Sequence, residues 1–382
     1  MKKKIYWCLP QLNDIGGTEM VTLQIIKMLE EEYEIHIVLF DHVDFDKVSY
    51  NLPESVIIED IGFPPEIIQL DLNFNRKIEN KQFLKAINLK LYCAYFYLFK
   101  RFKIRKKLLE ISSKDDIFVF PSFELMCFAP RGRHIVQHFH FNSKLYNNLF
   151  SHVDRLLARK PDSFIFLSES TYKAINKRNK INGTIIHNPS RYLRKKNFEY
   201  HNNTLMTACR LEHQKNPLLL VKIANELKKM DFPYVFNIYG DGSYKGLMER
   251  YIKEHDLSNV HIYSGLNDLE DAYSNADLYL ITSYFEGFPL SVIEANSFSI
   301  PAIWKEMGDP TNSVILEGIN GYVIDSNNPK EFAKRIMEVF SDKDKLKSLK
   351  ESTYEFSKRY EENEIRKDWQ NFFAKEFDSL DK

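Results

Sequence analysis

The sequence predicts an α/β protein made of two doubly wound, Rossmann-like domains with a cleft between them. Three observations predict this fold class. Apolar runs typical of buried strands alternate with helical patterns from the amino terminus, the alternation begins again at Leu205, and a polar, aperiodic stretch separates the two halves. A chain of 382 residues also exceeds what one hydrophobic core usually fills. A single large α/β domain is the alternative.

The first half opens with a strand, a loop and a helix. An apolar run at residues 4–10 predicts the strand, and apolar residues at helical spacing predict a helix from Thr18. A second strand at 34–40 completes a βαβ unit, which implies a parallel sheet. Further strand patterns lie at 116–122, 134–141, 162–170 and 183–190. We assign residues 1–190 to the N-terminal domain.

The second half repeats this alternation and ends in helices. Strands are predicted at 205–209, 234–240, 260–265, 277–283 and 301–305, with helices at 217–229 and 244–255 among those between them. We assign residues 200–360 to the C-terminal domain, because the segment 188–203 is polar and lacks periodicity. The last helix carries an aromatic stripe that must be buried, so residues 361–382 are expected to pack back on the N-terminal domain. The stripe consists of Trp369, Phe372, Phe373 and Phe377.

The composition excludes some classes of function. Lys plus Arg equals Asp plus Glu at 53 each, so the overall charge gives no argument for a nucleic-acid partner. The longest uncharged apolar run, residues 91–99, has about half the length that a bilayer requires, so no membrane span is predicted. The cysteines form no CxxC pair and suit a reduced, cytoplasmic compartment. They are Cys8, Cys93, Cys127 and Cys209.

The stretch "SYFEGFPLSVIEANS", residues 283–297, follows an apolar strand and places two carboxylates eight positions apart. Glu286 is expected in the loop at the carboxyl edge of the sheet, and Glu294 more than one turn into the next helix. Pro289 suits the first turn of that helix. Carboxylates beside free loop amides suit a polyhydroxylated ligand. The alternative is a solvated loop glutamate and a helix glutamate stabilised by the helix dipole.

Other strand ends carry groups suited to phosphate. Arg210 ends the first strand of the second half and Lys215 precedes its helix, so the two cations can neutralise a diphosphate. Gly240 ends another strand and permits close approach of a ligand to the backbone. Gly16 and Gly17 precede a helix whose N-terminus favours phosphate. The alternatives are solvated cations and an ordinary Gly-Gly turn.

These residues, in this order, resemble the large retaining glycosyltransferase family with the GT-B fold, called family 4 or "glycosyl transferases group 1". The likeness runs from Leu205 to about Val323 through "ACRLEHQKNP", "YGDG", "SYFEGFPLSVIEANSFSIP" and "EGINGYVI". It is looser in the first half, where "NDIGGTE", "FLSES" and "IIHNP" carry it. Such enzymes transfer a sugar from a nucleotide-sugar with retention at the anomeric carbon and without a bound metal. The resemblance therefore implies neither a cofactor nor a metal site.

The resemblance also implies roles for individual residues. Arg210 and Lys215 would stabilise the leaving diphosphate, and Glu294 would hold the ribose hydroxyls. Glu286 would position the donor sugar together with the amides that follow it. The implied donor-binding set is Gly16, Gly17, Gly240, Leu266, Gly287, Phe288, Pro289, Leu290 and Glu294.

The sequence departs from the family pattern at three places. Phe298 and Ser299 stand where the family usually has Cys-Gly, and residues 305–315 replace its Gly-Gly-x-x-Glu pattern. The histidine that usually contacts the sugar has two candidates, His138 and His140, which share a strand face with His134. The family register favours His140. The alternatives are strand histidines with satisfied hydrogen bonds, or a zinc site.

Residues 99–107 carry six basic residues in nine and follow an aromatic segment. Such a helix could lie on an anionic membrane surface near a lipid-held acceptor. The alternative is a solvated helix face whose aromatic side joins the core.

We therefore predict a cytoplasmic, peripherally membrane-associated retaining glycosyltransferase. It would use a nucleotide-sugar, with UDP favoured, and a glycan or lipid-linked acceptor bound by the N-terminal domain, in surface polysaccharide or lipopolysaccharide synthesis. A GDP- or ADP-sugar enzyme, a phosphorylase and a catalytically silent GT-B subunit that binds a partner or glycan are the alternatives.

Overall fold

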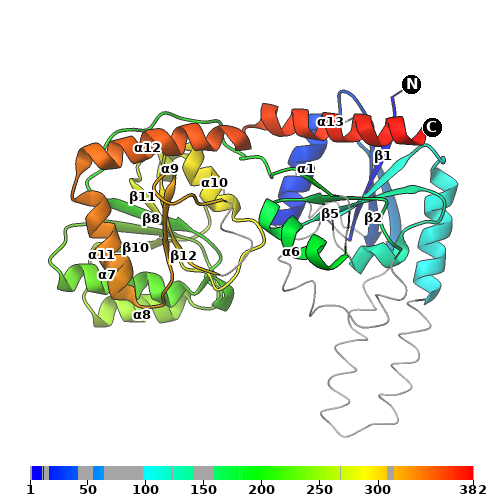
Figure 1. Ribbon diagram of the computed structural model, residues 1–382. Coiled ribbons are helices and arrows are strands. Elements are labelled where there is room, and N and C mark those ends of the chain that lie inside the picture. The colour runs from blue at the N-terminus through cyan, green and yellow to red at the C-terminus, as the bar shows by residue number, and fades with distance from the viewer. Residues whose placement is uncertain are drawn as a thin grey trace, which may run out of the picture.

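Two separate parallel sheets form the framework, one in each half of the chain (Figure 1). The prediction of two doubly wound α/β halves is confirmed. This computed structural model describes residues 2–10, 12, 17–41, 55–63, 98–121, 124–140, 159–179, 181, 183–266, 268–307 and 314–381. Gly16, Cys93 and the aromatic segment 91–97 lie outside these ranges.

The first sheet has the order β3-β2-β1-β4-β5-β6-β7, and every pair of neighbours is parallel. Its strands are β1 (Lys4–Leu9), β2 (Glu34–Asp41), β3 (Ile57–Phe63), β4 (Ile117–Phe120), β5 (His134–Phe139), β6 (Ser163–Phe166) and β7 (Gly183–Ile185). The sequence pattern did not predict β3. Helix α1 (Gly17–Leu29) packs on one face of this sheet, and residues 98–111 form a helix on the other. Helix α6 (Glu169–Asn179) and the 3-10 turn η2 (Glu124–Phe128) complete this half.

The second sheet has the order β10-β9-β8-β11-β12-β13, again with parallel neighbours. Its strands are β8 (Thr204–Ala208), β9 (Val235–Tyr239), β10 (Val260–Tyr263), β11 (Leu278–Ile281), β12 (Ala302–Lys305) and β13 (Gly321–Ile324). The crossovers are η3 (His213–Lys215), α7 (Pro217–Lys229), α8 (Lys245–Glu254), α9 (Glu270–Ser274) and α10 (Leu290–Ser297). Two buried apolar clusters flank the sheet, one of them including residues of α7 and α11 and the other residues of α9 and α10.

The C-terminal helices run from the second half back to the first. Helices α11 (Pro329–Phe340) and α12 (Lys343–Ser357) cover the second sheet, η5 (Lys358–Tyr360) follows, and α13 (Glu362–Leu380) lies over the first half (Figure 1). The centroid of the Trp369 ring lies 5.3 Å from that of Trp7 of β1 and 5.1 Å from that of His138 of β5. The aromatic stripe of the last helix thus joins the core of the first sheet. Within the described ranges, no helix is both long enough and apolar enough to cross a bilayer.

The strand order fixes where ligands can bind. In the second sheet, β8 lies between β9 and β11. The chain continues from β8 to β9 on one side and from β11 to β12 on the other, so these two connections run in opposite directions. Such a switch point opens a crevice at the carboxyl ends of the strands, because the helices that follow lie on opposite faces. Arg210 follows β8 and Glu286 follows β11, which explains why residues far apart in sequence reach one edge.

Candidate active site

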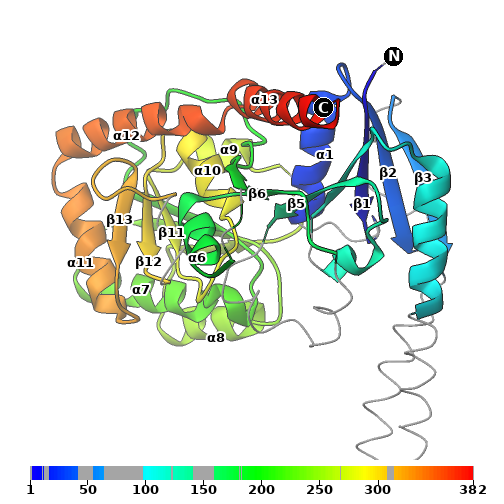
Figure 2. The same ribbon diagram turned by 45° about the vertical axis from the view of Figure 1, so that its right-hand side comes forward.

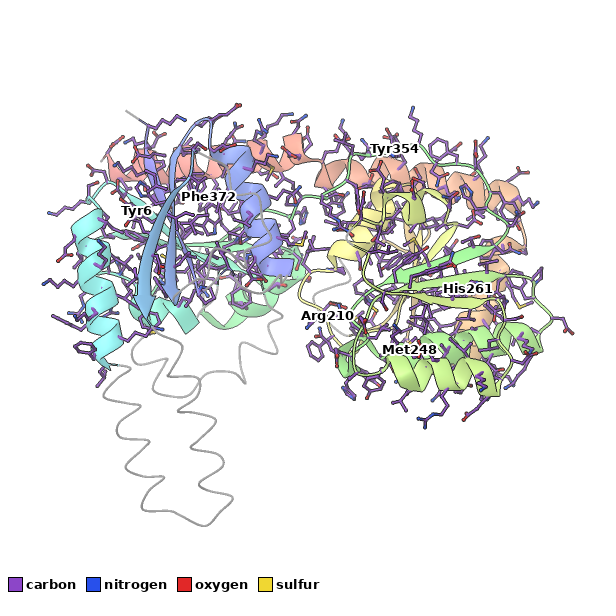
Figure 3. All side chains as sticks on the ribbon, turned by 180° about the vertical axis from the view of Figure 1, so that it is seen from behind. Tyr6, Arg210, Met248, His261, Tyr354 and Phe372 are labelled. Carbon is purple, nitrogen blue, oxygen red and sulfur yellow. The ribbon has the colours of Figure 1, made fainter. Side chains whose placement is uncertain are left out.

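A cavity of about 870 Å³ lies between α1 and the carboxyl edge of the second sheet. Its walls include five of the residues that the sequence singles out: Arg210, Gly240, Leu266, Leu290 and Glu294. Helix α1 forms the facing wall with Met20, Val21, Leu23, Gln24 and Lys27. Figure 3 shows Arg210 on the side of the second half that faces the first. The cavity is therefore formed by both domains.

Glu294 is held at the cavity wall by partners on two other segments. Its Oε1 lies 3.0 Å from Arg191 Nε, and its Oε2 accepts a hydrogen bond of 2.9 Å from the Tyr273 hydroxyl. Burial raises the pKa of Glu294 above its ordinary value, while the positive charge of Arg191 and the hydrogen bond from Tyr273 act in the opposite direction. This is an ordered carboxylate with lone pairs available on the cavity side.

Lys215 and Glu286 form a second ion pair at the same sheet edge. Lys215 Nζ lies 2.6 and 2.9 Å from the two carboxylate oxygens, and Ser283 Oγ donates to Oε1 at 2.5 Å. Glu286 is only 5% exposed, so it is not a solvated loop residue. Both charges act on the Cys209 thiol, as does that of Arg210, although burial is what chiefly raises the pKa of this thiol to about 11. The three charged groups predicted to handle the diphosphate and sugar therefore surround one strand end.

The loop after Glu286 differs in detail from the prediction. Helix α10 begins at Leu290, so Pro289 precedes the first turn as the N-cap residue and does not lie within it. The Leu290 amide is not free either, because it donates to the Phe288 carbonyl at 3.0 Å. The Phe288 ring packs against His187 and Tyr360. The loop, including Gly287, is thus braced from the segments that join the domains.

Two glycines stand where the backbone of another segment approaches closely. A Cβ atom on Gly240 would lie 1.9 Å from the Cys209 carbonyl oxygen, so this position admits only glycine whatever the ligand. A Cβ on Gly17, the first residue of α1, would lie 3.3 Å from Leu290 Cδ1 of the second domain. The N-terminus of α1 therefore lies against α10.

His134, His138 and His140 are not among the residues that line the cavity. His134 contacts Glu376 of α13 at 2.6 Å and His138 contacts Trp369, which confirms that they share a face of β5. His140 is buried, and its Nε2 shares a hydrogen bond of 3.0 Å with His138 Nδ1. Burial lowers the pKa of His140 to about 3, so its imidazole is neutral at neutral pH. The described residues contain no group of three or more His, Cys, Asp or Glu side chains that could hold a metal ion.

Several cavity residues escaped the sequence analysis. Arg191 lies in the polar stretch that was taken only as a domain boundary. Tyr239 and Tyr263 end neighbouring strands and stack with ring centroids 5.1 Å apart on the cavity wall. Gln24 donates from α1 to the Ser190 carbonyl at 2.9 Å. Of these residues, only the two tyrosines could have been found from the sequence. Each of them ends a predicted strand just before a loop that contains glycine.

Comparison with solved structures assigns the architecture. A mutant of S. aureus TarM, solved in complex with Fondaparinux, alpha-GlcNAc-glycerol and UDP, has a TM-score of 0.73 at 16% identity. The superposition covers 97% of this chain and 99% of that one. The fold is GT-B.

Sequence comparison supports the catalytic class. Residues 190–356 match the model of the family described as "Glycosyl transferases group 1". An "Uncharacterized glycosyltransferase" of Haemophilus influenzae is 22% identical over 96% of this chain and 99% of its own. The family match and the relatives' names together support a glycosyltransferase, and further relatives are named for polysaccharide and glycan biosynthesis.

Other relatives are longer proteins. The UDP-N-acetylglucosamine--peptide N-acetylglucosaminyltransferase GtfA subunit of Streptococcus pneumoniae is 28% identical over 173 residues, which is 44% of this chain and 34% of that protein. The chain spans about a third of the length of the first relatives it matches. Those matches concern less than half of the present chain.

Proposed function

We propose that this protein is a retaining, metal-independent glycosyltransferase that uses a UDP-sugar as donor. The observation that carries the proposal is the meeting of Arg210 and Glu294 in one cavity at the switch point of the second sheet. A guanidinium suits a diphosphate, and a buried carboxylate suits a pair of ribose hydroxyls. TarM, which has the same fold, was crystallised with UDP.

The reaction needs positive charge where the diphosphate leaves. As the bond from the anomeric carbon to the phosphate oxygen breaks, negative charge grows on the diphosphate and the sugar becomes oxocarbenium-like. Arg210 and Lys215 would stabilise the growing negative charge in place of a metal ion, and preorganised charges of this kind typically supply the largest share of catalysis. Lys215 is already positioned at this edge by its contacts with Glu286.

The remaining predicted residues would position the donor. Glu286 is assigned a positioning role with an electrostatic contribution, since its buried carboxylate lies beside the cation. Gly17, Gly240, Leu266 and the loop from Gly287 to Leu290 would surround the nucleotide-sugar. His140 would contact the donor from the first domain, with His138 as the alternative.

Donor use can be tested directly. The protein is incubated with a panel of UDP-, GDP- and ADP-sugars in the presence of a chelator, and release of nucleoside diphosphate is measured with and without glycan or lipid-linked acceptors. Release from UDP-sugars that persists with chelator supports the proposal, and the anomeric configuration of the product tests retention. Binding of a partner protein or glycan, without binding or turnover of any donor, would instead favour a catalytically silent subunit.

We further propose that the acceptor is a glycan or a lipid-linked glycan, assembled into surface polysaccharide or lipopolysaccharide at the cytoplasmic face of the membrane. The names of the relatives support glycan biosynthesis. The helix at 98–111, drawn in cyan in Figure 2, supports membrane contact. Its Phe102 is 67% exposed, and the same helix carries Lys103, Lys106 and Lys107. Lysines and an exposed aromatic ring together favour an anionic bilayer surface.

Liposome sedimentation tests this surface. Replacing Phe102 with Ser and Lys103, Lys106 and Lys107 with Gln should reduce binding to vesicles that contain anionic lipid, each lysine contributing about 1 kcal/mol. Replacing Lys222, Lys334 and Lys347 of the second domain with Gln is the control with the same loss of charge. Equal binding by both variants would contradict membrane contact through this helix.

A further inference from the structure

Arg191 is held in a defined position between the linker and the cavity. Its Nε contacts Glu294 at 3.0 Å, and its guanidinium carbon lies 4.6 Å from the centroid of the Tyr192 ring. Tyr192 is itself fixed, because its hydroxyl donates to Asp268 at 3.0 Å and accepts from the Leu269 amide at 3.0 Å. An arginine held both by a ring and by a carboxylate is preorganised, whereas a solvated surface arginine is not.

The Glu294 carboxylate has few other partners that stabilise its negative charge. Glu294 is largely buried, and besides Arg191 its carboxylate accepts a hydrogen bond from Tyr273 of α9. Loss of the arginine would leave a buried carboxylate with one neutral donor, which favours the protonated form. Among the described residues, the titratable and charged groups that face Glu294 or share its cavity are Arg191, Tyr192, Tyr273, Lys27, Cys209, Arg210, Tyr239, Asp241, Tyr263 and Glu362.

We propose that Arg191 is a positioning residue that keeps the Glu294 carboxylate ionised and aimed at both hydroxyls of a vicinal diol. The site would thereby select ribonucleoside over 2′-deoxyribonucleoside diphosphates. The inference rests on the proposed function of this cavity. Glu294 Oε2 already accepts one hydrogen bond, from Tyr273, and Oε1 is ion-paired with Arg191, so each oxygen retains a lone pair for one hydroxyl of the ligand. A protonated carboxyl loses part of this acceptor capacity.

The same linker provides a matched control. Arg194 is also ion-paired, at 2.8 Å to Glu361, and stacks over Tyr354 with 3.9 Å between its guanidinium carbon and the ring centroid. It is absent from the residues that line the cavity. Arg194 and Arg191 therefore share the linker, the charge and the kind of contact, but only Arg191 touches the proposed ribose-binding carboxylate.

The test is calorimetric binding of UDP and 2′-deoxy-UDP to the full chain at a series of pH values from about 5.5 to 8, because burial raises the pKa of the Glu294 carboxyl above its ordinary value. The terminal phosphate of UDP also titrates there, so each variant is compared with the wild type at the same pH. At the highest pH, the affinity of Arg191→Gln for UDP should lie within about threefold of that of the wild type. At the lowest pH, it should be about tenfold weaker than that of the wild type, which corresponds to the loss of one hydrogen bond to a charged group. Its preference for UDP over the deoxy analogue should shrink in parallel.

Three further variants make the outcome decisive. Arg191→Lys should restore most of the wild-type profile, Arg194→Gln should follow the wild type throughout, and Arg191→Gln combined with Glu294→Gln should lose the added pH dependence. Parallel profiles for Arg191→Gln and the wild type would overturn the inference, as would the same shift in Arg194→Gln. If the wild type binds no nucleoside diphosphate at all, the proposed function fails with it, and the wild-type titration alone reveals that case.

Discussion

The second domain presents two carboxylates near its cleft edge, and their partners come from different parts of the chain. Glu286 contacts Lys215 and Ser283, which belong to the same domain. Glu294 contacts Arg191, which the interdomain linker carries, and Tyr273 of α9. The first pair is therefore complete within one domain, whereas the second depends on how the linker is attached.

The difference suggests a division of labour. The linker is attached to both domains through Ser190. Its carbonyl accepts a hydrogen bond from the Gln24 side chain of α1, and its amide donates one of 2.9 Å to the Tyr360 carbonyl. We infer that the Glu286 pair keeps its geometry whatever the linker does. The Glu294 pair would instead make the proposed nucleotide binding sensitive to the arrangement of the domains.

The largest expected effect is on the Glu286 pair. Lys215→Ala should lower turnover about 10²- to 10³-fold, because a preorganised charge for the leaving diphosphate is lost. It should also lower the free energy of unfolding by about 1–3 kcal/mol, because Glu286 stays buried without its cation. Steady-state kinetics and denaturant titration measure the two effects. Adding Glu286→Gln should restore stability but not turnover, and recovery of turnover would contradict the assigned role of Lys215.

The next effect concerns nucleotide affinity. Glu294→Ala should weaken UDP binding about 10- to 100-fold at neutral pH, the worth of hydrogen bonds to a charged acceptor. Glu286→Ala should change the affinity for UDP much less, because this residue is assigned to the sugar. Calorimetry with UDP and with the intact donor separates the two. An equal loss of UDP affinity in both variants would remove the distinction between the sites.

Stability should respond to the two carboxylates with opposite sign. The folded pKa of Glu294 is raised by burial, so its contribution to stability is present below the ordinary glutamate pKa and is lost as pH rises through the folded value. Glu294→Gln replaces the ionised carboxylate with a neutral side chain, so the stability lost on ionisation is regained. The free energy of unfolding at neutral pH should therefore rise. Glu286→Gln should lower it by about 1 kcal/mol, because Lys215 loses its partner. Denaturant unfolding between about pH 4 and 8 measures both, and changes of the same sign would contradict the comparison.

The smallest effect is expected where the linker meets α10. Ser299 has a φ of 64°, in the left-handed region that favours glycine, yet its hydroxyl donates to the Lys195 carbonyl at 2.8 Å and accepts from the Asn197 amide at 3.2 Å. Ser299→Gly should relieve strain of about 1 kcal/mol and lose hydrogen bonds of similar worth. Stability should therefore change little, while UDP affinity falls by less than about threefold as the linker loosens. A large loss of affinity would mean that the linker controls the site more strongly than the static contacts indicate.

Much of the framework was readable from the chain. The buried strands β1, β8 and β11 were predicted as apolar runs, and the Pro217 helix has the predicted bounds, because strand and helix periodicities are expressed over a few consecutive residues. The positions of Arg210 and Glu294 followed from the same logic. Polar residues just beyond parallel strands, or in the first turns after them, must gather at one sheet edge.

Tertiary structure decided which of these groups touch. The Lys215–Glu286 pair, and the contact of Arg191 with Glu294, join residues that are far apart in the chain and carry no mutual signal in it. The strand period put His134 and His138 on one face, but only the packing of α13 determined that Trp369 would cover that face. Short-range patterns are set by local backbone geometry, which the sequence expresses directly. Pairing and burial depend instead on how the whole chain packs. That packing brings Arg191 of the linker into contact with the Glu294 carboxylate.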